Sequence, residues 1–82
     1  MDAKSISVEI ERNGFLDIDV LSTALAQKDA LEVGKILSEL AYMENGKYLY
    51  GVAQLLKVLG EFYQYDIENI QAVYPNLGEA QL

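Results

Sequence analysis

The chain has 82 residues, with 13 acidic against 6 basic side chains, a net charge of −7, and neither cysteine nor histidine. That length supports one hydrophobic core, so we expect a single compact domain over residues 1–82. The charge disfavours direct binding to nucleic acid or to an anionic membrane surface, and the missing cysteines exclude disulfides, zinc–thiolate sites and thiol nucleophiles. No apolar run is long enough to span a bilayer, and the first residues lack the apolar stretch of a signal peptide, so we expect a cytoplasmic protein.

Residues 5–20 alternate between apolar and polar side chains on both sides of an Asn-Gly pair. Apolar residues stand at every second position in SISVEIE (5–11) and again in FLDIDV (15–20). A period of two is typical of β-strands. A three-residue loop with a left-handed Gly14 places Ile10 opposite Leu16 and makes one face wholly apolar. We therefore predict a β-hairpin over residues 5–20.

The polar face of this hairpin would carry four carboxylates, Glu9, Glu11, Asp17 and Asp19. In the predicted register Glu9 stands opposite Asp17, a like-charge pair that destabilises the hairpin by about a few tenths of a kcal/mol. The face either keeps the sheet soluble and free of edge aggregation, or docks on a basic groove by imitating nucleic-acid phosphates. A calcium site is a third reading, but the spacing is not that of an EF-hand, and we expect no metal.

Four helices are predicted after the hairpin. We expect them at about residues 20–27, 30–44, 47–62 and 66–74. Asp29 and Glu32 form a capping-box pattern at the start of the second helix, where Gly34 would permit a close helix crossing. Asp66 is a good N-cap for the last helix, and Pro75 ends it.

These elements predict an α+β domain with an N-terminal β-hairpin packed on three to four short α-helices. A lone hairpin is marginal in water, so helices must cover its apolar face. Residues 47–50, KYLY, either begin a helix or form a third strand. The helix over 47–62 is apolar around most of its surface, so it forms either the centre of the fold or half of a homodimer interface.

Six of the residues are tyrosine, which is amphipathic and enriched at binding hot spots. Any one of them can instead pack between helices with its hydroxyl in solvent. We select Tyr50, Tyr63 and Tyr65 as candidate partner-binding residues; in EFYQYDIEN, residues 61–69, Tyr63 and Tyr65 stand among acidic side chains.

One stretch resembles a known group of proteins. In FLDIDVLSTALAQKDALEVGKILSELA, residues 15–41, a strand would lead into a short helix and then into a capped helix that ends in L-x-E-L-A. This pattern resembles small acidic bacteriophage-encoded proteins. Some of those proteins inhibit host nucleic-acid enzymes, including CRISPR effectors, so the resemblance implies an anti-host inhibitor. It carries over no functional residue.

No nucleophile elbow, phosphate-binding loop or dinucleotide-binding motif occurs, so we expect a protein that is not an enzyme and uses no cofactor. The leading hypothesis is a protein-binding module, an acidic inhibitor or adaptor that occupies a basic, nucleic-acid-binding surface of a partner protein. The partner-binding residues would be Glu9, Glu11, Asp17, Asp19, Tyr50, Tyr63 and Tyr65. The alternative is a structural protein that forms homodimers through residues 47–62, with an acidic face that only confers solubility.

Overall fold

The computed structural model describes residues 1–79, and this part of the chain is helical without any strand. The α-helices are α1 (Ala3–Asn13), α2 (Ile18–Leu25), α3 (Ala30–Tyr42), α4 (Leu49–Phe62) and α5 (Ile67–Val73). Short 3₁₀ turns follow α3 at Met43–Gly46 and α5 at Pro75–Glu79. The prediction of an α+β fold with a hairpin over residues 5–20 is therefore wrong.

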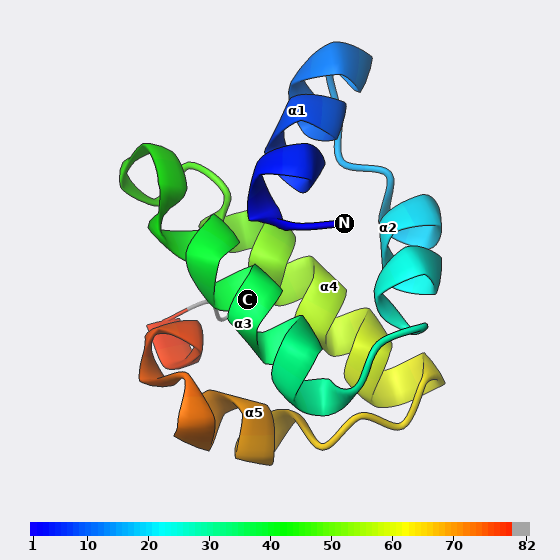
Figure 1. The fold of residues 1–82 in the computed structure, drawn as a ribbon, viewed down its shortest axis with the longest axis vertical. Coiled ribbons are helices and arrows are strands. Elements are labelled where there is room, and N and C mark those ends of the chain that lie inside the picture. The colour runs from blue at the N-terminus through cyan, green and yellow to red at the C-terminus, as the bar shows by residue number, and fades with distance from the viewer. Residues whose placement is uncertain (80–82) are drawn as a thin grey trace.

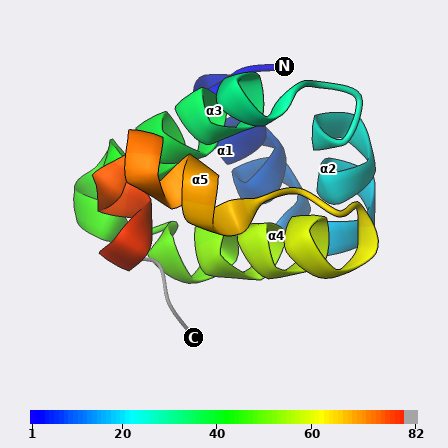
Figure 2. The same cartoon turned by 90° about the horizontal axis from the view of Figure 1, so that it is seen from below.

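Helices α3 and α4 form the centre of the domain as an antiparallel pair (Figure 1). Helix α1 packs mainly against α3, and α2 packs against α4. Helix α5 covers the opposite side of the central pair, where it contacts both α3 and α4 (Figure 2). The N-terminal segment thus contributes two helices to one side of the core, where the hairpin was expected to lie.

Helix α1 forms because a helical period is hidden within the alternating pattern. Ala3, Ile6, Ser7 and Ile10 share one helical face, and the first three of them are buried. Val8, which a strand would have buried beside them, is 45% exposed. The helix ends at Gly14, whose φ of 77° is left-handed and whose N–H bonds to the Ile10 carbonyl at 2.9 Å. The Asn-Gly pair therefore ends a helix and does not turn a hairpin.

The start of α2 depends on Asp17. Its carboxylate accepts a hydrogen bond from the Val20 backbone N–H at 3.2 Å, which caps the helix. Leu21 and Leu25 then face the core, while Val20 is 57% exposed. Residues 15–20, which were predicted as a strand, instead form the connection after α1, the N-cap of α2 and the first turn of α2.

Aspartates cap four of the five α-helices. Asp2, Asp17, Asp29 and Asp66 each accept a hydrogen bond from a backbone N–H three residues later. The caps at Asp29 and Asp66 are the ones that the sequence pattern predicted. Three further acidic residues, Asp19, Glu32 and Glu68, lie in first turns, where a negative charge interacts favourably with the helix dipole. A large part of the acidic excess thus serves the starts of helices.

Gly34 allows α3 and α5 to cross closely, as its position in the sequence predicted. A Cβ atom at this position would lie 2.7 Å from Cδ2 and 2.8 Å from Cε2 of Tyr74, and 3.1 Å from Cγ2 of Ile70. Ordinary carbon contacts lie near 3.5–4.0 Å. The absence of a side chain at Gly34 therefore sets how closely the two helices approach.

The chain reverses between α3 and α4 through a left-handed turn. Glu44 and Asn45 have φ values of 50° and 55°, and Gly46 follows with 85°. Beyond this turn the KYLY segment enters α4, so the reading of these residues as a strand is wrong.

Helix α4 lies at the centre of the fold beside α3. Its apolar residues Val52, Ala53, Leu55, Leu56 and Leu59 are buried within the same chain. Fully buried side chains from the other elements meet them, namely Ile6, Leu25, Val33, Leu37, Leu40, Ile70 and Leu77. Most of the apolar surface that suggested an interface is therefore used in the core.

Candidate functional site

The four carboxylates assigned to the hairpin do not form one patch. Glu9 pairs with Arg12 of the same helix at 3.5 Å, with both side chains largely in solvent. Asp17 is occupied as the cap of α2. Glu11 and Asp19 lie on different helices and border different hollows. The expected opposition of Glu9 and Asp17 across a hairpin is wrong, because both residues belong to helical segments.

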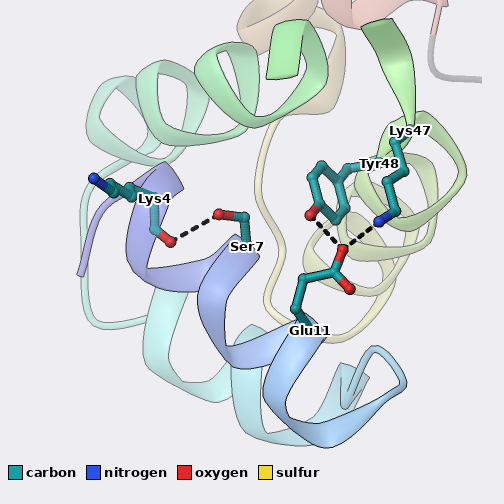
Figure 3. Close-up of polar contacts among 5 residues, drawn as sticks. All are labelled: Lys4, Ser7, Glu11, Lys47 and Tyr48. Atoms are coloured by element: carbon teal, nitrogen blue, oxygen red, sulfur yellow. Dashed lines mark hydrogen bonds and ion pairs between the residues drawn. The ribbon is translucent and has the colours of Figure 1, made fainter. Parts of the chain in front are cut away.

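Glu11 connects the end of α1 to the start of α4 (Figure 3). Its Oε1 atom accepts a hydrogen bond from the Tyr48 hydroxyl at 2.9 Å and another from the Lys47 ammonium group. The Lys47 nitrogen also lies 5.6 Å from the centre of the Tyr48 ring, within cation–π range. Both donors use the same oxygen, so Oε2 of Glu11 has no hydrogen bond to the described residues.

The contacts of this cluster keep Glu11 ionised. The hydrogen bond from Lys47, and then the one from Tyr48, hold the pKa of the Glu11 carboxyl below its ordinary value of 4.5. The pKa of Lys47 is raised by the same bond. Burial, reinforced by the bond to Glu11, raises the pKa of Tyr48, so its hydroxyl remains a donor. The cluster therefore presents a fixed carboxylate at the protein surface.

A hollow of about 450 Å³, the first hollow, lies beside this cluster. Its apolar lining comes from Ile10, Leu16, Ile18, Tyr48 and Tyr50. Gly51 also lines it, close to Leu16, whose Cδ2 atom would lie 3.0 Å from a Cβ atom at this position. A largely apolar concavity with a few polar groups at its edge is the usual form of a binding site.

A second hollow, of about 280 Å³, lies further along the surface between α2 and α4. Asp19 and Thr23 line it from α2, and Val58, Phe62 and Tyr63 line it from α4 and its C-cap. The Thr23 and Tyr63 hydroxyl groups lie 3.2 Å apart and share a hydrogen bond. Both hollows thus border α4: the first lies against α1 and the connection to α2, and the second lies against α2.

One row of α4 side chains joins the two hollows. Tyr50, Gln54, Val58 and Phe62 follow one another at intervals of four residues, so each is a neighbour of the next on the helix surface. Together they form a ridge inclined to the helix axis, which we call the α4 row. Tyr50 and Gln54 line the first hollow, and Val58 and Phe62 line the second. Tyr50 is 68% and Phe62 72% exposed, which is high for aromatic side chains.

The three tyrosines selected from the sequence have different places. Tyr50 lies at the first hollow and Tyr63 at the second. Tyr65 is half-buried, and its hydroxyl donates hydrogen bonds to the Lys28 carbonyl and, at 3.4 Å, to the Leu25 carbonyl. Burial raises the pKa of Tyr65, which keeps this donor protonated. Tyr65 therefore stabilises the connection between α2 and α3, and its hydroxyl is poorly placed to contact a partner protein.

Sequence reasoning missed several residues of this surface. Lys47, Tyr48, Gln54 and Phe62 all line it, but none was selected. The four-residue spacing of the α4 row was present in the sequence and could have revealed Phe62. The bonds of Lys47 and Tyr48 to Glu11 span 36 and 37 residues, and only the fold brings them together.

Two wider observations concern the described residues as a whole. None of their helices combines the length and apolar character needed to cross a membrane. Between residues 1 and 79 no three acidic side chains gather closely enough to hold a metal ion.

Comparison of the chain with protein-family models, with curated proteins and with solved structures found no match.

Proposed function

We propose that this chain is a non-enzymatic protein-binding module, an acidic inhibitor or adaptor that acts in the cytoplasm. It contacts a basic surface of its partner through the α4 row and the two hollows beside it. The observation that carries the proposal is the exposure of Tyr50 and Phe62 at either end of this row. Aromatic side chains in solvent contribute little to the fold, whereas buried aromatic side chains dominate the energy of protein interfaces.

The charge of the chain supports a basic partner. A net charge of −7 on 82 residues attracts positively charged surfaces and raises association rates at low salt. Within the described residues Glu9 is paired with Arg12 and Glu11 with Lys47, whereas no ion pair engages Asp19. Two of the four carboxylates first selected from the sequence, Glu11 and Asp19, therefore remain at the proposed contact surface.

Site-specific photo-crosslinking tests this proposal. A photoreactive residue replaces Tyr50 in the full chain, which is then irradiated in an extract of its source cells. The matched control carries the same group at Lys35, an exposed position of α3 that lines neither hollow. We expect adducts with another protein from position 50 but not from position 35, and fewer adducts as the salt concentration rises.

Two outcomes would count against the proposal. If position 50 gives no protein adduct, or gives the same adducts as position 35, the α4 row is not a contact surface. If the only adduct is a second copy of the chain, the alternative of a homodimer through residues 47–62 is correct. Sedimentation at several concentrations would then show a dimer.

A further inference from the structure

The length of the α4 row sets the size of what can lie along it. Tyr50 and Phe62 are separated by 12 positions on one helix. At a rise of about 1.5 Å per residue, the row is about 18 Å long. That length corresponds to about three turns of a second helix, whose apolar side chains would be spaced to reach both hollows.

The chemistry of the surface favours a helix over an extended peptide. Extended peptides that bind through their backbone add a strand to an exposed sheet edge, and the part of the chain that the structure describes has no strand. Recognition must therefore use side chains. Two apolar hollows along one inclined ridge can receive residues from a single stripe of an amphipathic helix that crosses α4 at an angle, in which apolar positions recur every three or four residues.

Each hollow also has a carboxylate at its edge. Glu11 lies at the first hollow with its Oε2 atom free of hydrogen bonds to the described residues. Asp19 lies at the second hollow, and no ion pair engages it within residues 1–79. Lysine or arginine side chains that flank an apolar stripe would meet both carboxylates. A second copy of this acidic chain would instead bring like charges together.

We infer that the α4 row is the docking site for an amphipathic basic helix of the partner protein, with apolar side chains in both hollows and basic side chains at Glu11 and Asp19. This inference rests on the proposed function and specifies the kind of partner segment. Glu11 is already positioned for the contact, because Tyr48 and Lys47 hold its other oxygen (Figure 3). A bound helix would cover the exposed rings of Tyr50 and Phe62.

A pair of synthetic peptides tests the inference on the full chain. The first is a leucine–lysine–alanine peptide of about four helical turns, with leucines alternately three and four residues apart. The second has the same composition in an order that gives no apolar stripe. Titration calorimetry should show at least about tenfold tighter binding of the first peptide, because only its leucines reach both hollows.

Variants then locate the binding site. Tyr50→Ala should weaken binding of the amphipathic peptide by at least about tenfold, because it removes an aromatic contact residue. Glu11→Gln and Asp19→Asn should each weaken it by about three- to tenfold and reduce its dependence on salt. Glu39→Gln is the matched control, since it removes the same charge from an exposed position of α3 outside both hollows and should leave affinity unchanged. Circular dichroism of each variant checks that the fold is retained.

Several results would overturn the inference. Equal affinity for the two peptides would show attraction by charge alone, and an equal loss in Glu39→Gln would show that no local contact is made. A dimer that the peptide fails to dissociate would assign the row to a second copy. If the amphipathic peptide does not bind but position 50 still gives crosslinks to a partner protein, the helical occupant is refuted and the proposed function stands. Absence of that crosslinking would refute both.

Discussion

Replacing Gly34 with alanine should destabilise the protein by about 1 kcal/mol. The new Cβ atom would lie 2.7 Å and 2.8 Å from two carbons of the Tyr74 ring, so the ring or the helix must move by about 0.8 Å to restore ordinary contact. Overpacking of this kind costs about 1–3 kcal/mol. Alanine is better than glycine inside a helix by roughly 1 kcal/mol, which offsets part of that cost.

Urea and thermal unfolding measure the effect. For a domain of this size, a loss of about 1 kcal/mol lowers Tm by about 4–8 °C. Gly51→Ala is the matched control, because its Cβ atom would approach only the flexible end of Leu16, at 3.0 Å. That variant should be as stable as the parent or gain up to about 1 kcal/mol from helix propensity.

A double-mutant cycle with Tyr74→Ala isolates the contact. Without the ring, the nearest of the atoms that remain is Cγ2 of Ile70, at 3.1 Å from the new Cβ atom. Gly34→Ala should then be neutral or stabilising, with a coupling energy of about 1–2 kcal/mol. The reasoning is refuted if Gly34→Ala stabilises the parent protein, or if it destabilises both backgrounds equally.

Three further changes test other contacts. Asp29→Ala should cost about 1 kcal/mol in urea unfolding because it uncaps α3, whereas Asp29→Ser should cost less than half of that; equal losses would contradict the capping role. The pKa of Glu11 is lowered in the folded state, so its bond to Lys47 stabilises the protein above pH 4.5 and is lost as the pH falls through the folded pKa. The urea midpoints of Glu11→Gln and of the parent protein should therefore converge in acid. Lys47, with a raised pKa, loses the same bond only as the pH rises through a value above 10.5. Tyr65→Phe should cost about 1 kcal/mol and speed hydrogen exchange between α2 and α3, whereas Tyr63→Phe, which loses an exposed bond, should change little.

The sequence predicted the second half of the fold better than the first because the local signals there agree. Asp29 and Asp66 are unambiguous caps, and long apolar stripes follow them. In the first half, Ile6 and Ile10 satisfy a period of two and a helical period alike. Ser7 distinguishes the two periods, because it lies on the buried face of the helix. Its hydroxyl is satisfied there by donating a hydrogen bond to the Lys4 carbonyl at 2.8 Å. A count of apolar positions treats this serine as exposed, and so the helical face was missed.

The candidate site was only partly predictable for a related reason. Carboxylates on alternate positions of a strand share one face, whereas on helices and at caps they point in several directions. Glu11 and Asp19 still border the surface proposed for binding, but Glu9 and Asp17 serve contacts within the chain. The partners of Glu11 are far away in sequence, and no local pattern indicates contacts that depend on how helices pack.

The aspartate caps make the charge of this protein separable from its architecture. Asparagine caps a helix about as well as aspartate, because its side-chain oxygen accepts the same backbone hydrogen bond. Asparagine at Asp2, Asp17, Asp29 and Asp66 would change the net charge from −7 to −3 and keep an acceptor at each helix start. Natural drift between these two residue types can therefore adjust how strongly the protein attracts basic partners, while the arrangement of its helices stays the same.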